Sequence, residues 1–254
     1  MAVDAATSLR RGILVLRALG SGEALGVLQI ARLVGQDKSQ VSRTLKTLSE
    51  YGLVDRDPET RAYRLGWGVF ELAARAGDMR LVTAGESVVS ALAQSLGERV
   101  HLSVLHGVEV LTLLSRSTSR AIEASGWAGR TVPAYCTSAG YVLLLDTDVR
   151  RLLAGVELVR LAPNTPRSLD EVVARVGAAR ELGYSVADED FEPGLIGIAA
   201  PVRDFRGRVA AALNVSAPKF RLEARIAELG AAVTAAAASL STLVGALPSE
   251  KLSV

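Results

Sequence analysis

The stretch from Asp37 to Asp57, DKSQVSRTLKTLSEYGLVDRD, decides the fold of the N-terminal part of the chain. Asp37 can cap a helix, and Gln40 three residues later gives a start like a capping box. The apolar residues then follow at helical spacing: Val41, Leu45 and Leu48. Gly52 is suited to end the helix, because glycine adopts the left-handed conformation common after a C-cap. The stretch therefore predicts a short amphipathic helix with a sharp end.

The open side of this helix carries polar and basic side chains, concentrated in its first turns. These are Lys38, Ser39, Gln40, Ser42, Arg43, Lys46 and Thr47. A solvated amphipathic helix would have a similar pattern, since polar outer faces are the rule. A recognition helix, however, reads base edges in the major groove with the residues near its N-terminus. The segments around the helix decide between these two interpretations.

Those flanking segments favour the recognition helix. The apolar spacing predicts a helix over residues 7–19, and glycines bound a second, short helix over residues 27–34. Residues 53–55 and 62–65 have the pattern of a strand hairpin, whose basic side chains are Arg56, Arg61 and Arg64. Three helices followed by a hairpin match a winged helix-turn-helix. We therefore expect the helix to enter the major groove of DNA and the basic hairpin to hold the phosphate backbone.

The bulk composition is that of a globular protein. The 254 residues are 49% hydrophobic, and the net charge is only +2, so overall charge does not identify a nucleic-acid partner. Residues 1–64 carry ten Lys or Arg against seven Asp or Glu, which places the positive excess at the N-terminal end. The single Cys136 suits a reducing cytoplasm. The first twenty residues lack a signal-peptide pattern, and the alanine-rich stretch over 231–246 is interpreted as a packed helix rather than a membrane span.

The pattern of the chain changes at Gly77-Asp78, which interrupts a nearly continuous helical periodicity over residues 66–97. Before this break Val69, Leu72 and Ala73 are the expected inward positions. Beyond it, strand pairs are predicted over 100–105 with 108–114 and over 196–202 with 209–215, and helices over 139–145, 168–182 and 223–243. This mixture predicts an α+β domain around an antiparallel sheet. We expect a DNA-binding domain over 1–66, a linker helix over 67–78 and a second domain over 79–254.

In this order and spacing, the segments resemble the IclR family of bacterial transcriptional regulators, from about residue 8 to residue 246. The likeness is carried by IARLVGQDKSQVSRTLKTLSEYGLVDRDPETRAYRLG, by RTVPAYCTSAGYVLL and by RELGYSVADEDFEPGLIGIAAPVRDFRGRVAAALNVSAP. The resemblance implies an N-terminal winged helix-turn-helix joined by a linker helix to a GAF-like α/β effector-binding domain with an antiparallel sheet. It also implies assembly as dimers or tetramers on operator DNA.

The resemblance also implies positions for an effector pocket. The backbone of Ser138 and Ala139 matches positions that bind an effector carboxylate or carbonyl, which suits free amides at a helix start. On the late strand, Asn214 aligns with one pocket serine of the family, and Ser216 keeps the other. The full set that we expect around the effector is Ile122, Trp127, Val132, Tyr135, Cys136, Ser138, Ala139, Asp188, Ile198, Asn214 and Ser216.

Two departures from the family pattern bear on the size of the effector. Ala187 stands where the family usually has an acidic pocket residue, and Gly197 stands where it frequently has a cysteine. Losing a carboxylate and a thiol makes the pocket roomier and less polar than one built for a two- or three-carbon keto acid. We therefore favour a larger and aromatic effector, as in the branch of the family that regulates aromatic catabolism.

The alternative class of function is an enzyme, a small-molecule hydrolase or isomerase with an appended interaction domain. Cys136, His101 and Asp188 could form a nucleophilic set, but no strained nucleophile motif accompanies them. His101 and His106 are five residues apart along a predicted strand and would face opposite sides, so a metal site would consist mostly of carboxylates. We expect no catalytic residue, no metal and no cofactor.

The sequence thus predicts a cytoplasmic regulator of a catabolic operon, a homodimer or homotetramer without a membrane partner. It would bind double-stranded operator DNA and respond to a small organic or aromatic acid, and repression is favoured over activation. A homodimer would read a pseudo-palindrome with half-sites spaced by helical turns. The effector would act through its different affinities for two arrangements of the protein.

Overall fold

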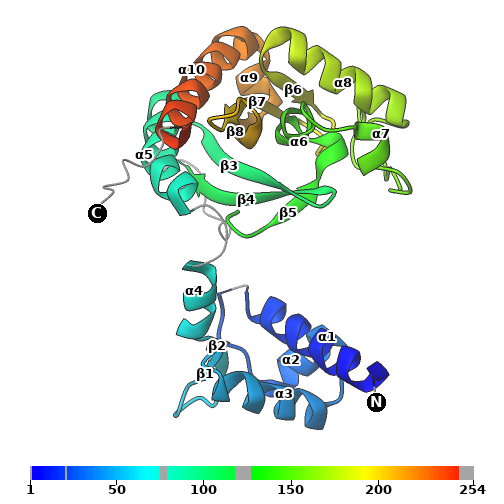
Figure 1. Cartoon of the computed structure of the whole chain (residues 1–254), viewed down its shortest axis with the longest axis vertical. Coiled ribbons are helices and arrows are strands. Elements are labelled where there is room, and N and C mark those ends of the chain that lie inside the picture. The colour runs from blue at the N-terminus through cyan, green and yellow to red at the C-terminus, as the bar shows by residue number, and fades with distance from the viewer. Residues whose placement is uncertain (1, 21, 75–78, 118–126, 246–254) are drawn as a thin grey trace, which may run out of the picture. The chain divides into compact units, whose positions relative to one another are not determined.

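The computed structural model describes residues 2–20, 22–74, 79–117 and 127–245, and the chain divides into two compact units, residues 1–79 and 80–254 (Figure 1). The first unit contains α1 (Ala2–Leu19), α2 (Val27–Val34), α3 (Lys38–Glu50), β1 (Val54–Arg56), β2 (Tyr63–Leu65) and α4 (Trp67–Ala74). The predicted winged helix-turn-helix is confirmed, although α1 begins earlier than residue 7. The predicted linker helix corresponds to α4 in its described part, and residues 75–78 lie outside the described residues.

The core of the first unit explains why α3 turns its polar side outward. Side chains from the three helices pack together and are at most 1% exposed: Val15, Leu19, Ile30, Val41 and Leu45. Gly35 makes the turn between α2 and α3 with a φ of 63°, a left-handed conformation that costs a residue with a Cβ more than glycine. Burying Val41 and Leu45 therefore fixes which residues of α3 face solvent.

The second unit is built on one antiparallel sheet of six strands, in the order β5-β4-β3-β8-β7-β6. The strands are β3 (Arg99–His106), β4 (Glu109–Arg116), β5 (Thr131–Pro133), β6 (Ser185–Asp188), β7 (Leu195–Arg203) and β8 (Val209–Pro218). The predicted pairs β3–β4 and β7–β8 are hairpins, and they meet where β3 pairs with β8. The two short outer strands β5 and β6 are additions to the prediction.

One face of the sheet is covered by α5 (Met79–Leu96) and α10 (Ile226–Gly245), which Figure 1 shows together on one side of the strands. The core between them is aliphatic and includes Ile196 and Ile198 of β7 and Leu213 and Val215 of β8. By length and composition the segment Lys219–Gly245 is apolar enough to cross a membrane. In this fold, however, Leu229, Val233, Ala237 and Leu240 of α10 are buried in that core, as expected for a packed helix.

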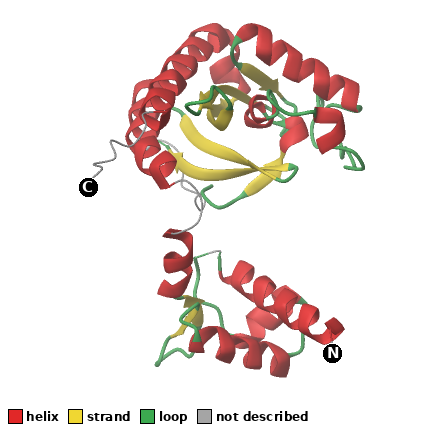
Figure 2. Cartoon of the chain, viewed as in Figure 1, coloured by secondary structure: helices red, strands yellow, loops and turns green. Residues whose placement is uncertain are grey.

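The other face of the sheet is covered only in part. The elements on this side are the 3-10 turn Ala134–Cys136, α6 (Ser138–Leu143), α7 (Val149–Leu152) and α8 (Leu169–Leu182). The chain returns to the first face through α9 (Lys219–Leu222) and the 3-10 turn Glu223–Arg225. Figure 2 shows the sheet with helices on both sides. A second core joins α6 and α8 to Ala187, Ala199 and Ala212 of the sheet, and small side chains there let α6 approach the strands closely.

A β-bulge changes the alternation of β4. Leu102 lies opposite Leu114, but the next residue of β3, Ser103, lies opposite Thr112, so Leu113 is an extra residue in β4. Because of this insertion, Leu114 joins the core under α5, whereas Thr112 lines the cavity described below.

Candidate functional site

The first candidate site is the outer face of α3. Asp37 caps this helix, because its Oδ1 accepts a hydrogen bond from the Ser39 amide at 2.7 Å. Hydrogen bonding from the side chain and the amide of Ser39 lowers the pKa of Asp37. The predicted contact residues are exposed, apart from the half-buried Gln40: Lys38, Ser39, Ser42, Arg43, Lys46 and Thr47. The structure thus presents the predicted polar face, with Arg43 extending along the helix so that its Nε donates to the Ser39 carbonyl at 3.4 Å.

The wing between β1 and β2 is a tight, ordered turn. Asp57 Oδ1 accepts hydrogen bonds from the amides of Thr60 and Glu59 at 2.7 and 3.0 Å. Hydrogen bonding from the amide and side chain of Thr60, and then from the Glu59 amide, lowers the pKa of Asp57. Arg61 closes the turn with a φ of 61°.

The three predicted basic residues of the wing are all exposed. Arg56 lies 5.3 Å from the centroid of the Tyr63 ring, and Arg64 lies 4.0 Å from Asp55. The wing therefore presents three cations on a rigid hairpin.

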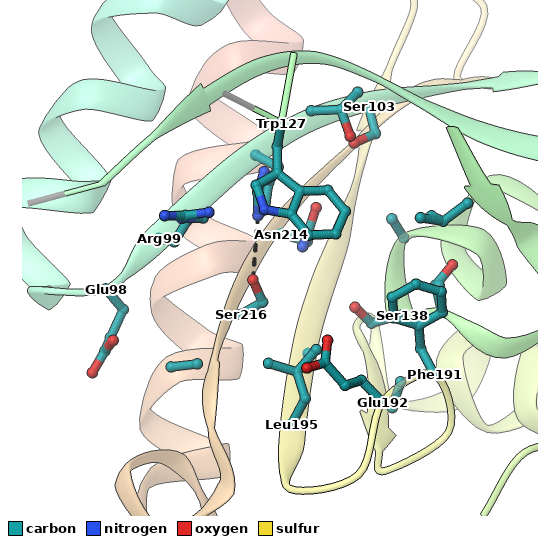
Figure 3. A pocket seen from close by; sticks show the side chains of 18 of the residues that line it. Glu98, Arg99, Ser103, Trp127, Ser138, Phe191, Glu192, Leu195, Asn214 and Ser216 are labelled. Carbon is teal, nitrogen blue, oxygen red and sulfur yellow. Dashed lines mark hydrogen bonds between the residues drawn. The ribbon is translucent and has the colours of Figure 1, made fainter. Parts of the chain in front are cut away.

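The second candidate site is a cavity of about 410 Å³ on the sheet face that carries α6. Its floor consists of residues from β4, β3, β8 and β7, and one wall is the start of α6 with Thr137, Ser138 and Ala139. Figure 3 shows Trp127 over the floor, with Phe191, Glu192 and Leu195 on the side opposite Arg99. Thr137 caps α6, since its Oγ1 accepts from the Gly140 amide at 3.1 Å.

The cavity floor is unusually polar for a buried surface. Five polar residues that line the cavity are less than 9% exposed: His101, Ser103, Thr112 and Asn214 of the floor, and Ser138 of the wall. Buried polar groups are normally hydrogen-bonded, and leaving one unsatisfied costs about 1–3 kcal/mol. Such a floor is therefore suited to a ligand that brings its own polar groups.

His101 lies at the centre of this floor and is uncharged at neutral pH. Burial, and secondarily the charge of Arg99, lowers the pKa of His101 to about 4. Its Nε2 lies 3.2 Å from Ser216 Oγ, while its Nδ1 has no hydrogen-bond partner within the described part of the chain. The edge of Trp127 packs against the imidazole with a centroid distance of 5.9 Å.

Charged side chains lie at the edge of the cavity. Arg221 pairs with Glu98 at 2.8 Å, and Arg99 lines the same edge. Lys219 pairs with Asp188 and Glu189, both at 2.9 Å; the hydrogen bonds from Lys219 lower the pKa of Glu189. Apart from Arg99 at the start of β3, the described floor residues carry no charge.

The segment that supplies Phe191 and Glu192 is held by the buried Asp190. Its Oδ2 accepts a hydrogen bond from the Tyr141 hydroxyl at 2.6 Å and lies 3.5 Å from Nε of Arg175. Burial raises the pKa of Asp190, and burial together with this carboxylate raises the pKa of Tyr141. Asp190 therefore ties the cavity wall to α6 and α8.

Six of the predicted effector residues line the cavity: Trp127, Val132, Ser138, Ala139, Asn214 and Ser216. Ala187 and Gly197, the two departures from the family pattern, line it as well. A Cβ at Gly197 would lie 2.7 Å from Ser138 Oγ, which shows how closely the start of α6 lies over β7. Ile122 lies outside the described residues.

Four predicted residues do not line the cavity, and the structure corrects the prediction there. Ile198 is the neighbour of Gly197 and points to the opposite face of the sheet, into the core under α10. Tyr135 and Cys136 are buried in the core below α6, where the Tyr135 hydroxyl donates to the Val159 carbonyl at 3.0 Å. Asp188 forms an ion pair with Lys219 and is not among the lining residues.

The sequence prediction missed several lining residues, chiefly His101, Ser103, Thr112, Arg99 and Arg221. Alternation along β3 could have found two of them, because His101 and Ser103 are polar residues two positions apart in an otherwise apolar strand. Thr112 had no such signal, since the bulge at Leu113 reverses the alternation.

The hypothetical nucleophilic set is not assembled. Burial raises the pKa of Cys136 to about 12, so the reactive thiolate is absent at neutral pH. Cys136 lies in the core and Asp188 in an ion pair with Lys219, whereas His101 faces the cavity. Among the described residues, no three metal-ligating side chains lie together.

Residues 73–242 match the family described as Bacterial transcriptional regulator IclR C-terminal, and residues 8–58 match the IclR helix-turn-helix domain. The chain belongs to the IclR family. Among curated IclR relatives, the HTH-type transcriptional regulator KdgR of Escherichia coli K12 is 31% identical over 247 residues, covering 95% of this chain and 94% of KdgR. The Pca regulon regulatory protein of Pseudomonas putida is 32% identical over 219 residues, covering 84% and 75%.

Solved IclR structures share the fold. The crystal structure of an IclR homolog from Microbacterium hydrocarbonoxydans, complexed with 4-hydroxybenzoate, superposes with a TM-score of 0.81 at 25% identity, covering 93% of this chain and 98% of that one. The chain is therefore a DNA-binding transcriptional regulator with an effector-binding C-terminal domain, and it is not an enzyme.

Proposed function

We propose that this IclR-family regulator is a repressor of a catabolic operon. An organic acid, most simply an aromatic one, binds in the cavity of the second unit and changes the affinity for operator DNA. α3 enters the major groove with Arg43 and its polar neighbours, and the basic wing holds the backbone.

One observation carries the effector proposal: the cavity of about 410 Å³ has a floor of nearly buried polar side chains. Its volume lies within the range of about 300–1,000 Å³ that is usual for small-molecule sites. Ala187 and Gly197 leave room at the wall near Ser138. Backbone amides at a helix start are free donors, and those of Ser138 and Ala139 would hold the carboxylate. The 4-hydroxybenzoate in one solved homolog supports an acid of aromatic size.

The experiment that tests this function is a gel-shift of the purified protein on the DNA upstream of its own reading frame. It is repeated at two salt concentrations and with a panel of aromatic and keto acids. We expect a specific shift that weakens with salt, because phosphate contacts release counterions, and that one class of acid changes. Glyoxylate or pyruvate binding much more tightly than benzoate-type acids would overturn the aromatic effector.

Arg43→Ala tests the recognition helix. If Arg43 makes a bidentate base contact, operator affinity should fall by about 1–3 kcal/mol and specificity should relax at one position. Arg167→Ala is the matched control, because it removes the same charge from an exposed residue of the other unit. An unchanged affinity and footprint for Arg43→Ala would exclude that role for the side chain.

The assembly that we propose is a cytoplasmic homodimer, with a tetramer as the larger alternative. Two copies of α3 would then read the two halves of a pseudo-palindromic operator. The effector shifts the equilibrium between two arrangements of the copies only by its differential affinity for them.

A further inference from the structure

A pair of hydroxyl side chains lies at one end of the cavity floor, away from the start of α6. Ser103 and Thr112 are direct cross-strand partners on β3 and β4, and both line the cavity. They are only 1% and 6% exposed. Both side chains therefore place a hydroxyl in the nearly buried lining of the cavity. Since nearly all buried hydroxyls in proteins are paired, this pair has the character of a subsite that a ligand completes.

The cavity lining beside the pair is apolar. Val110 and Val132 are its neighbours in the lining, on β4 and β5. The described charged lining residues are Glu98, Arg99, Glu192 and Arg221, and none of them belongs to β4 or β5. Arg99 is four residues before Ser103 on β3, which corresponds to about 13 Å along a strand. Arg130, whose carbonyl oxygen accepts a hydrogen bond from the Thr112 amide at 3.0 Å, is not among the residues that line the cavity. The lining beside the pair is therefore suited to a neutral polar group.

The pair and the start of α6 stand at opposite sides of the floor. Ser138 lies over Gly197 on β7, whereas Thr112 is on β4, three strands away in the order β4-β3-β8-β7. Adjacent strands are about 4.8 Å apart, so the two sides are separated by about 14 Å at floor level. Side chains projecting inward from both sides shorten this gap for a ligand. Figure 3 shows Trp127 between Ser103 and Ser216, above the floor that joins the two sides.

We infer that Ser103 and Thr112 form a second subsite that binds the hydroxyl of a hydroxylated aromatic monocarboxylate, whose carboxylate is held at the start of α6. The inference rests on the proposed function, since it takes the cavity to be the effector site. A ring holds its carboxylate and its distal hydroxyl apart, as the two polar sides require, and Trp127, Val132 and Phe191 provide apolar walls for it. A short keto acid cannot reach both sides.

The test is calorimetric binding of 4-hydroxybenzoate, benzoate and terephthalate to the full chain and to the double variant Ser103→Ala/Thr112→Val. The wild-type protein should bind 4-hydroxybenzoate about tenfold more tightly than benzoate, because benzoate leaves the two buried hydroxyls unpaired. Terephthalate should bind weakest, since it brings a second charge to a neutral subsite. The double variant should bind the first two acids about equally.

Three further variants make the result specific. Thr112→Ser keeps the hydroxyl and should keep the preference, and Ser115→Ala removes a hydroxyl from β4 outside the cavity lining and should also keep it. If circular dichroism shows that the double variant is unfolded, Ser103→Ala alone, which removes one atom, should still lower the preference severalfold.

Failure of the subsite and failure of the proposed function give different results. A double variant that retains the full preference for 4-hydroxybenzoate would overturn the subsite while leaving the effector cavity in place. The aromatic effector itself would be overturned by two results together: the wild-type protein binds none of the three acids, and none of them changes the gel-shift on operator DNA.

Discussion

At the scale of a single residue, His101 shows how the centre of the cavity floor is kept uncharged. The imidazole is buried below Trp127 with one nitrogen unpaired, and burial lowers its pKa from 6.5 to about 4. A protonated His101 would place a positive charge on the floor, where no carboxylate within the described residues faces it. Protonation of His101 would therefore destabilise the folded second unit, so part of the free energy of unfolding depends on pH.

The direction of this pH dependence follows from the lowered pKa. Below about pH 6.5 an unfolded chain protonates His101, whereas the folded protein does not until about pH 4, so stability is lost as the pH falls between these values. The loss attributable to His101 should reach about 3 kcal/mol. His101→Gln should remove this slope in urea unfolding measured at pH 7 and pH 4.5.

The raised pKa of Asp190 acts in the opposite direction, but it is common to both proteins and cancels in the comparison. The same substitution at the exposed His106 on β3 controls for the loss of an imidazole. A stability difference between wild type and His101→Gln that stays constant with pH would contradict the expectation.

At the scale of the elements, the close packing of α6 on the sheet positions the cavity wall. Two glycines permit this packing in different ways. A Cβ at Gly140 would lie 2.0 Å from the Ala134 carbonyl oxygen, which belongs to the backbone, whereas a Cβ at Gly197 would meet only the Ser138 hydroxyl at 2.7 Å. The first contact cannot relax without moving α6, but the second can relax by rotation of one side chain.

Alanine should therefore affect stability at the first position and ligand binding at the second. Gly140→Ala should lower the free energy of unfolding by about 1–3 kcal/mol or more through overpacking. Gly197→Ala should change it by less than about 1 kcal/mol but should weaken the binding of aromatic acids, because it narrows the cavity beside Ser138. Urea unfolding and calorimetry measure the two effects, and equal destabilisation by both variants would refute this account of the packing.

The elements also show how far the sequence could predict the fold and the site. Helical spacing and glycine caps were sufficient for α2, α3 and α8, and alternation was sufficient for the two hairpins. Positions matched through the family resemblance placed Ser138, Asn214 and Ser216 in the lining. The face of Ile198 was missed although alternation beside Gly197 could have settled it. The bulge at Leu113 left no trace in the sequence, because an extra residue is visible only against its partner strand.

At the scale of the whole molecule, α4 carries apolar surface that the rest of the first unit leaves exposed. Trp67, Phe70 and Leu72 are 80%, 61% and 64% exposed, although the sequence pattern predicted Leu72 as an inward position. Trp67 and Phe70 contact each other edge to face with centroids 6.0 Å apart. A helix that is apolar on several sides is normally buried, and a second copy of the chain would supply the cover.

Leu72→Glu should therefore weaken self-association. Placing a charge in a surface that becomes buried on dimerisation is costly, so the dimer dissociation constant in analytical ultracentrifugation should rise at least about tenfold, and operator affinity should fall with it. Leu182→Glu on α8 changes a leucine of similar exposure, 59%, and is the matched control. Equal effects of both variants, or no effect of either, would argue against α4 as the contact.

The two faces of the sheet in the second unit have a consequence for the history of such regulators. In the stretches Arg99–Ser103 of β3, Leu195–Ile198 of β7 and Leu213–Ser216 of β8, residues that line the cavity alternate with residues of the aliphatic core. Mutations at the lining positions can alter the accepted small molecule while their neighbours continue to hold the fold. A regulator built in this way can evolve from one effector to another through single amino-acid substitutions, and the protein at each step can still fold.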